Sequence, residues 1–468
     1  MSQTKTVFGI LAHSVAPEIA ASIEELIETA PDSELNRINV FTFGAKTGHD
    51  VQQVISAFLH AARLGIFDMS WNVLCPGCGG VLQEGAVLKT VNRDRYNCSL
   101  CSAGYEPTLD EMVEVTFTVN PRTRRIAAHD PDTLPMWDYA RQIFFSSGVD
   151  LPAKIEPLLQ DIVLDAVELP PGDRAFISLQ LPREFVIVFD PVTHATQFID
   201  VQGEVTRERQ AVSVVLDGKH VQNNTIVLHP GPLRLSFENR TDRRVLPALW
   251  IAGDHLHELL GRRTPFLTAK RLLTNQTFRD LYRTETLDVD QRLKITSLTF
   301  LFTDLKGSTT LYERVGDLVA YDLVRAHFRM LAEIVDSEAG AVVKTIGDAV
   351  MATFHTPDRA LAAALRMRDA MRIFNEQHKH GEILLKIGIH EGPCLAVSLN
   401  DRQDYFGQTV NIASRVQNLS VSQSIFATSA VTDDPQSTQI LAARGIAPKR
   451  HEVSLRGLDT VRSVYEIP

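Results

Sequence analysis

The sequence predicts a multidomain chain of the α+β class. Two closely spaced pairs of cysteines fall within residues 71–115, and short alternating runs separated by Pro-Gly and Asp-Gly turns fill residues 166–250. From about Lys294 onward, strand-like and helix-like segments follow the order βαββαβ. A length of 468 residues is compatible with roughly three domains. The cysteine-containing segment, the strand-rich segment and the βαββαβ segment are therefore expected to belong to separate units.

The composition is that of an ordinary globular protein, with 44% hydrophobic and 22% charged residues. The formal net charge of -10 disfavours a broad nucleic-acid interface, which needs a basic surface, so no nucleic-acid partner is expected. No apolar run approaches the roughly 18–20 residues that span a bilayer, and the N-terminus lacks the pattern of a signal peptide. We therefore expect a cytoplasmic protein with no transmembrane segment.

Residues 1–70 are expected to be helical, because they contain amphipathic stretches near Ile19–Ile27 and Val51–Leu64. A second helix-like texture covers residues 132–163. It predicts a helical connector over residues 116–163.

Between these helical regions, four of the five cysteines form two pairs, Cys75/Cys78 and Cys98/Cys101, separated by nineteen residues. This spacing predicts a zinc ribbon over residues 71–115, with a structural Zn²⁺ held by four thiolates. A redox or metal sensor is an alternative. Catalytic zinc is disfavoured, because four thiolates leave no open position for chemistry. The fifth cysteine, Cys394, is expected to be a small buried residue.

Residues 164–252 are expected to form a small β-sandwich. Ala175–Leu181 and Leu233–Phe237 alternate between polar and apolar residues, and Phe185–Phe189 is a continuous apolar run. A helical linker is expected over residues 253–292, centred on Leu267–Arg283. It would connect the preceding regions to the last domain, although an ordinary packing helix is an equal alternative.

Residues 293–468 are expected to form the last domain. Ser297–Thr303 and Leu384–His390 are typical of buried strands, and Ala320–Val335 carries the apolar stripe of a helix that Gly340 would end. A hairpin is expected around Gly347, and a helix is expected to begin at Pro357. The order βαββαβ predicts a ferredoxin-like core.

Two aspartates in this domain are candidate metal ligands. Asp304 ends a strand just before a loop with Gly307, and Asp348 follows the glycine of the predicted hairpin. Two carboxylates on neighbouring strands can hold divalent ions that also bind substrate phosphates. Asn411 and Arg415 lie four residues apart on a predicted helix, where they share one face and could meet a ribose and a phosphate.

Each of these elements alone is weak, since such residues occur at many turns and helix surfaces. Together, and in this order, the motifs FTD, KTIGD, DYFG and VNIASR resemble the catalytic domain of class III adenylate and guanylate cyclases. The resemblance covers residues from about 295 to 468. The preceding residues resemble an uncharacterised module found before bacterial cyclase domains.

The resemblance implies a role for each motif residue. Asp304 and Asp348 match the metal-binding aspartates, which implies two Mg²⁺ or Mn²⁺ ions per active site. Lys344 and Asp404 match the pair that selects the purine. The remaining matches are to residues that stabilise the transition state or contact the triphosphate: Asn411, Arg415 and Arg456.

The family resemblance also implies a homodimer through this domain, because family active sites lie between two catalytic domains. A lysine that donates to adenine N1 and a carboxylate that accepts from N6 favour ATP. Guanine reverses that pattern, and each mispaired buried group costs about 1–3 kcal/mol. The predicted function is therefore an adenylate cyclase that makes cyclic AMP and pyrophosphate.

Three alternatives remain open: a guanylate cyclase, a nucleotide-binding signalling module without turnover, and a zinc-ribbon transcription factor. The acidic composition disfavours the transcription factor. The complete set of motif residues disfavours the module without turnover. The regulatory ligand or protein sensed by residues 1–292 is unknown.

Overall fold

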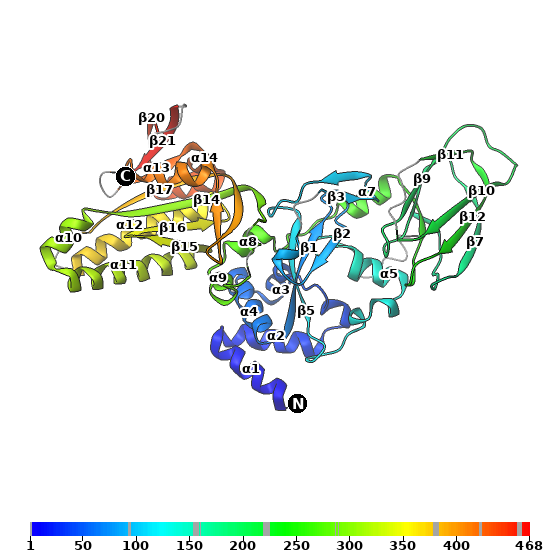
Figure 1. Cartoon of the computed structure of the whole chain (residues 1–468), viewed down its shortest axis with the longest axis horizontal. Coiled ribbons are helices and arrows are strands. Elements are labelled where there is room, and N and C mark those ends of the chain that lie inside the picture. Colours follow the sequence, from blue (N-terminus) through cyan, green and yellow to red (C-terminus); the bar gives the residue numbers. More distant parts are fainter. Residues whose placement is uncertain are drawn as a thin grey trace. The chain divides into compact units, whose positions relative to one another are not determined.

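The computed structural model describes residues 2–91, 95–152, 159, 161–218, 225–285, 287–288, 290–377, 383–420, 424–455 and 461–468. The chain divides into two compact units, which we treat separately (Figure 1). The N-terminal unit contains Met1–Pro107 and Glu111–Leu267. The C-terminal unit contains Thr268–Pro468 together with the short segment Thr108–Asp110.

The N-terminal unit begins with four helices: α1 (Ser2–Ser14), α2 (Pro17–Thr29), α3 (Val40–Thr47) and α4 (Val51–Arg63). Asn39 and Asp50 cap α3 and α4 through side-chain oxygens that accept backbone N–H groups. The helical texture ends earlier than the sequence predicts, because a strand already begins at Phe67.

That strand is the centre of a three-stranded antiparallel sheet with the order β2-β1-β5. Its members are β1 (Phe67–Leu74), β2 (Val81–Gly85) and β5 (Val113–Val119). A separate hairpin, β3 (Tyr96–Cys98) with β4 (Ala103–Tyr105), carries the second pair of cysteines. The cysteine pairs therefore lie on two different β-hairpins.

The predicted helical connector is largely wrong. Among the described residues of this stretch, the helical segments are short: α5 (Met136–Tyr139), a π-turn over Ala140–Phe144 and two 3₁₀ turns. Pro131 and Pro135 explain the difference, since each proline removes a backbone N–H donor and interrupts a longer helix.

Residues after this stretch form two sheets that share one apolar core. One sheet has the order β10-β12-β7, with strands Gln210–Leu216, Gly231–Asn239 and Arg174–Leu181. The other has the order β11-β9-β8-β13-β6, with strands Ile226–Leu228, Thr196–Val201, Phe185–Phe189, Ala248–Ile251 and Val163–Ala166. Buried residues from both sheets, such as Phe237 and Ile199, pack together as in a β-sandwich.

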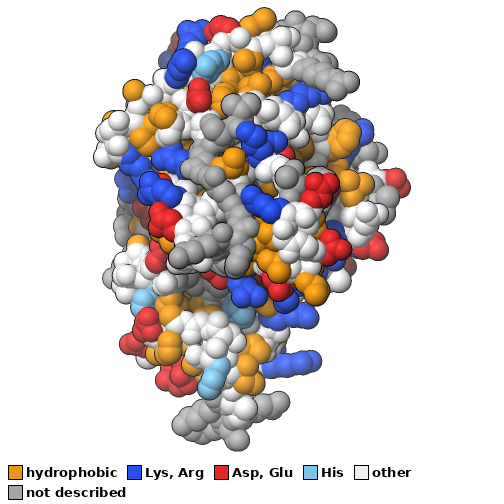
Figure 2. All heavy atoms as spheres, turned by 90° about the vertical axis from the view of Figure 1, so that its left-hand side faces the viewer, with side chains coloured by type: hydrophobic (Ala, Val, Ile, Leu, Met, Phe, Trp, Pro, Cys, Tyr) orange, Lys and Arg blue, Asp and Glu red, His pale blue; other side chains and the backbone are white. Residues whose placement is uncertain are grey.

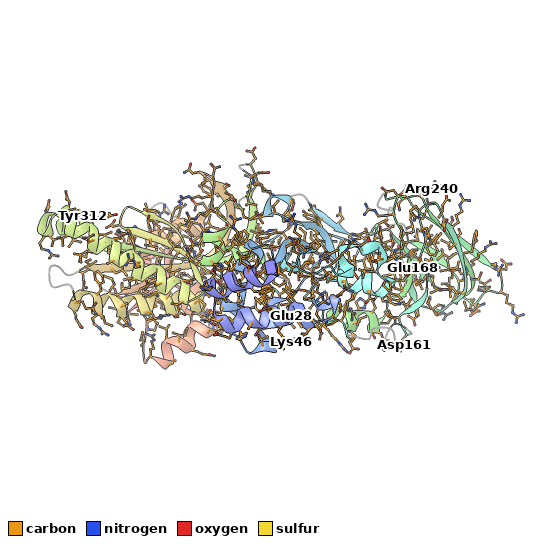
Figure 3. All side chains as sticks on the ribbon, turned by 90° about the horizontal axis from the view of Figure 1, so that it is seen from below. Glu28, Lys46, Asp161, Glu168, Arg240 and Tyr312 are labelled. Atoms are coloured by element: carbon orange, nitrogen blue, oxygen red, sulfur yellow. The ribbon has the colours of Figure 1, made fainter. Side chains whose placement is uncertain are left out.

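Ion pairs lie on the surface of these strands. Arg240, labelled in Figure 3, places its Nε 2.8 Å from Glu238 Oε1, and Arg244 Nη1 lies 3.2 Å from Glu168 Oε2. An exposed pair such as Arg240 with Glu238 contributes little to stability.

Three short helices occupy the predicted linker: α7 (Asp254–Gly261), α8 (Ala269–Leu273) and α9 (Gln276–Leu281). The expected continuous helix over Leu267–Arg283 is broken, because Asn275 interrupts it and caps α9 by accepting from Phe278 N.

The C-terminal unit is built on β14 (Leu293–Lys306), α10 (Ser308–Val315), α11 (Asp317–Ser337), β15 (Gly340–Ile346), β16 (Ala349–Phe354), α12 (Pro357–Gln377) and β17 (Leu384–Leu399). The strand order β15-β16-β14-β17 is antiparallel throughout, which is the arrangement of a ferredoxin-like core. The hairpin turns at Gly347, whose φ is 64°, and α12 begins at Pro357. Ala339, with φ of 59°, follows α11 in place of the expected Gly340.

The sheet continues from β17 through β19 (Ile425–Thr428) and β21 (Val461–Ile467) to β20 (Lys449–Ser454), and β18 (Arg402–Phe406) pairs with the end of β17. Consecutive residues of β19 face opposite sides of the sheet. Ile425 joins the large core that includes α11 and α12, whereas Phe426 joins a second core with α13 (Gln408–Gln417). Helices therefore cover both faces of the sheet (Figure 1).

Figure 2 shows one face of the molecule, where Lys and Arg side chains are interspersed with Asp, Glu and hydrophobic side chains. None of the described helices combines the length and the apolar character needed to cross a bilayer.

The packing of α13 on β17 depends on Gly388. A Cβ at this position would lie 2.1 Å from the backbone N of Gln417 and 2.3 Å from its Cα. Neither contact can be relieved by rotating a side chain, because both atoms belong to the helix backbone.

We expect Gly388→Ala to push α13 off the sheet and to destabilise the C-terminal unit by about 1–3 kcal/mol or more. Thermal denaturation monitored by circular dichroism measures the change in Tm. Gly261→Ala is the control, since its added Cβ meets no heavy atom within 4 Å. Equal Tm values for the two variants would contradict this close packing.

Candidate functional site

The two predicted metal ligands lie at one end of the pairing between β14 and β16. The last register pair is Thr303 with Val350, so Asp304 lies one residue beyond it, beside the turn that carries Asp348. Asp348 Oδ2 is buried and has no hydrogen-bond partner among the described residues. An unpaired buried carboxylate oxygen is costly, so this site is suited to a cation that would bind there.

A third charged residue lies at this end of the sheet and was not identified from the sequence. Lys386 is the register partner of Asp304 on β17, and its Nζ lies 3.1 Å from Asp304 Oδ2. Both side chains are largely buried, with 22% of Lys386 and 28% of Asp304 exposed. The lysine balances the charge of a metal-binding candidate from within the same chain.

Lys344 and Asp404 also come together, although sixty residues separate them. Lys344 lies on β15 and its ammonium pairs with the Asp404 carboxylate on β18. Asp404 is buried and its second oxygen accepts from Tyr405 N at 2.8 Å, whereas the lysine side chain is 43% exposed. The aspartate is fixed, and the lysine reaches it from a more open position.

Asn411 and Arg415 lie one turn apart on α13, as the sequence predicts. Asn411 is exposed and Arg415 is half-buried. Neither side chain makes a hydrogen bond or ion pair with any described part of the chain. Arg456 lies outside the described residues, as do the side chains of residues 308–310 at the start of α10.

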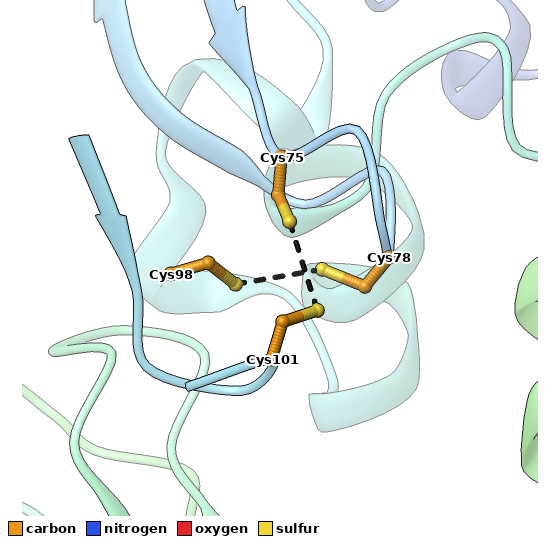
Figure 4. Close-up of side chains that lie close together, drawn as sticks. All are labelled: Cys75, Cys78, Cys98 and Cys101. Carbon is orange, nitrogen blue, oxygen red and sulfur yellow. Dashed lines mark hydrogen bonds between the residues drawn. The ribbon is translucent and has the colours of Figure 1, made fainter. Parts of the chain in front are cut away.

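The four paired cysteines converge on one point (Figure 4). Cys75 Sγ lies 3.6 Å from Cys101 Sγ, and Cys78 Sγ lies 3.7 Å from Cys98 Sγ. All four sulfur atoms lie within 4.8 Å of one another. The turn after the first pair is tight: Gly79 has φ of 73°, and Gly80 N donates to Cys78 Sγ at 3.4 Å.

Comparison with known proteins assigns both parts of the chain. Residues 1–280, which are more than half of the chain, match the model of a family of unknown function, DUF5939. The chain belongs to the DUF5939 family. Residues 291–464 match the adenylate and guanylate cyclase catalytic domain. The C-terminal unit is therefore a class III nucleotide cyclase domain, and the resemblance drawn from its motifs is confirmed.

Similar proteins share this cyclase domain. An adenylate cyclase of Anabaena cylindrica is 30% identical over 185 residues, which are 36% of this chain and 36% of that protein. Adenylate cyclase 2 of Rhizobium meliloti (strain 1021) is 33% identical over 132 residues, or 26% of this chain and 36% of the relative. This DUF5939 protein thus spans about a third of the length of those two relatives.

Proteins with other names match the same region. The atrial natriuretic peptide receptor 2 of Homo sapiens is 30% identical over 187 residues, which are 36% of this chain and 18% of the receptor. The crystal structure of the adenylyl cyclase CyaB from P. aeruginosa is 21% identical, with a TM-score of 0.34, and covers 38% of this chain and 96% of that one.

The cysteine cluster of the DUF5939 region has the dimensions of a zinc site. With Zn–S bonds of about 2.3 Å, the edges of a sulfur tetrahedron measure about 3.8 Å. The observed separations of 3.6 and 3.7 Å are close to that length. The cluster could therefore bind zinc, in a site whose four positions are all filled by cysteine.

If zinc occupies this site, the purified protein should contain one zinc ion per chain, measured by inductively coupled plasma mass spectrometry. Cys78→Ser should lose the metal and lower the Tm of the DUF5939 region, because structural zinc contributes directly to folding. Cys394→Ala is the control and should keep it, since burial raises the pKa of the Cys394 thiol to about 12 and it lies outside the cluster. Full metal content in Cys78→Ser would contradict the assignment.

Proposed function

We propose that this DUF5939 protein is an adenylate cyclase that converts ATP to 3′,5′-cyclic AMP and pyrophosphate. The observation that carries the choice of ATP is the ion pair between Lys344 and Asp404 within a class III cyclase domain. The DUF5939 region would regulate the reaction in response to a ligand or protein, and we expect the enzyme to act in the cytoplasm.

The pair matches the edge of adenine. With the two groups side by side, the Lys344 ammonium can donate to N1 while the Asp404 carboxylate accepts from the N6 amino group. Guanine has a donor at N1 and an acceptor at O6. The Lys344 donor would then face a donor, and the Asp404 acceptor would face an acceptor. Each such mismatch costs about 1–3 kcal/mol, so two of them select ATP strongly.

Asp304 and Asp348 would hold two Mg²⁺ or Mn²⁺ ions, for which carboxylates and substrate phosphates are the usual ligands. These cations would supply activation of the ribose 3′-oxygen and neutralise the leaving pyrophosphate. Lys386 supports this role, because its ion pair holds the Asp304 carboxylate in place on β14.

Asn411 and Arg415 would act on the ribose and on the charge that develops at the phosphate. Arginine can form two hydrogen bonds to a phosphate at once. The helix α13 presents both side chains from one face. Since neither is paired within the described chain, they are available to substrate.

We propose that the active enzyme is a homodimer with two equivalent sites. One chain would supply Asp304 and Asp348, and its partner would supply Lys344, Asp404, Asn411 and Arg415. Two large apolar side chains, each two residues from a member of the purine pair, support a covered surface there: Ile346 and Phe406 are 51% and 67% exposed. Exposed apolar patches are typical of interaction sites.

Purified full-length protein with Mg²⁺ or Mn²⁺ should release cyclic AMP and pyrophosphate from ATP, and Asp304→Ala and Arg415→Ala should each abolish this activity. Mixing the two inactive variants should restore roughly a quarter of wild-type activity, since about half of the dimers are mixed and each has one intact site. Two preparations of Asp304→Ala mixed together are the control. Nucleotide binding without pyrophosphate release would favour a signalling module, and no recovery on mixing would refute the shared site.

The double variant Lys344→Glu, Asp404→Cys should lower the kcat/KM for ATP by about a hundredfold, because it reverses the hydrogen-bonding pattern at the base. Turnover of GTP should rise relative to ATP. Lys449→Glu is the control, since it reverses an exposed charge on β20 outside the site. A wild-type enzyme that prefers GTP would instead establish a guanylate cyclase.

A further inference from the structure

The strand that carries Lys344 is irregular just before that residue. In the pairing of β15 with β16, Val342 faces Ala352 but Lys344 faces Met351, so Val343 is an extra residue in a β-bulge. A bulge bends its strand and turns the next side chain toward a new direction. Here the next side chain is Lys344, which is directed at Asp404 on β18.

Helix α9 binds the backbone of this bulge. Gln276 Oε1 accepts from Val342 N at 2.8 Å, and Arg279 Nη2 donates to Val343 O at 3.3 Å. The same Arg279 nitrogen donates to Gln403 O at 3.0 Å. Its two acceptors are thus the carbonyls directly before Lys344 and directly before Asp404.

Among the described residues, no backbone hydrogen bonds of the sheet join β15, which carries Lys344, to β18, which carries Asp404. β15 hydrogen-bonds to β16, and β18 hydrogen-bonds to β17. Arg279 therefore links β15 and β18, which share no strand pairing. It does so at Val343 and Gln403, the residues directly before Lys344 and Asp404.

Two further contacts involve α9 and the residue that ends α8. Phe278 is 1% exposed and stacks on Tyr282 with ring centroids 5.3 Å apart. Just before α9, Leu273 O accepts from the buried hydroxyl of Tyr405, the residue after Asp404, at 3.2 Å. The two neighbours of Asp404 in the chain are therefore bound by different helices: Gln403 by Arg279 of α9, and Tyr405 by Leu273 at the end of α8.

Upstream of α9, helix α8 contacts the only segment of the first 267 residues that belongs to the C-terminal unit. Lys270 N donates to Leu109 O at 2.8 Å, and Lys270 Nζ lies 3.3 Å from Asp110 Oδ1. The chain passes from one unit to the other at residues 107–108, 110–111 and 267–268. All three crossings adjoin α8 or the segment that α8 binds.

From these contacts we infer that Arg279 is a positioning residue that sets the geometry of the Lys344–Asp404 pair. Arg279 touches no reacting atom in this arrangement and acts through the two strands. The inference rests on the proposed function, in which Lys344 and Asp404 bind the base.

Arg279 Nη1 is buried and has no hydrogen-bond partner among the described residues, and a buried unpaired donor is unfavourable. The other terminal nitrogen of Arg279, Nη2, donates to both Val343 O and Gln403 O, next to Lys344 and Asp404.

The test compares Arg279→Ala with the wild type in full-length protein, using kcat/KM for ATP and for GTP. Arg279→Ala should reduce the preference for ATP over GTP at least about tenfold, because the two strands lose their common hydrogen-bond donor. Arg283→Ala is the matched control, an exposed arginine four residues later. Arg279→Lys, which keeps a positive donor, should restore part of the preference.

A lower Tm or kcat in Arg279→Ala with an unchanged ratio of ATP to GTP would overturn the inference, since a purely structural arginine would act in that way. If Arg279→Ala does not fold, Arg279→Lys provides the same comparison. If the wild type binds nucleotide without turnover, the cyclase proposal fails. The inference is then decided by the ratio of dissociation constants for fluorescent ATP and GTP analogues in the same variants.

Discussion

The cyclase domain depends on the pairing of two long strands, β14 and β17. Their antiparallel register runs from Leu293 opposite Ala396 to Lys306 opposite Leu384, with one irregularity after Ile295. One end of this ladder brings Lys386 beside Asp304. Near the other end, β17 pairs with β18, the strand that carries Asp404. Because side chains alternate along a strand, a slip of one residue would turn both groups of charges to the wrong face.

The polar residues of the candidate site differ in whether they have a partner within the described chain. Lys344 with Asp404 and Lys386 with Asp304 are paired within one chain, so their geometry exists before any substrate arrives. Asn411 and Arg415, in contrast, have no partner in the described chain. An unpaired cation is tolerated at a surface but is costly when buried. The half-exposed position of Arg415 is consistent with a group that would be enclosed only when nucleotide and a second domain cover it.

Local motifs were sufficient to place Asn411 and Arg415 on one helix, whereas the strand expected to end at Asp304 continues to Lys306. The turn at Gly347, the start of α12 at Pro357 and the convergence of the four cysteines all follow from short-range spacing. Lys386 and Arg279 were missed because their roles depend on cross-strand register and on a helix packed against a bulge, neither of which is encoded by neighbouring residues. The helical connector predicted over residues 116–163 is interrupted, because Pro131 and Pro135 limit the helical segments to short turns. Arg456 remains a prediction.

The position of β15 has a consequence for how this domain behaves on its own. Among the described strands, β15 is the outermost of the sheet, so one side of its backbone has no neighbour in that set. Open strands of this kind pair with strands of other molecules and lead to aggregation. Gln276 and Arg279 occupy backbone groups on this strand. Residues 276–279 thus also protect the sheet from self-association, and a catalytic fragment that begins after them would expose that strand to the solvent.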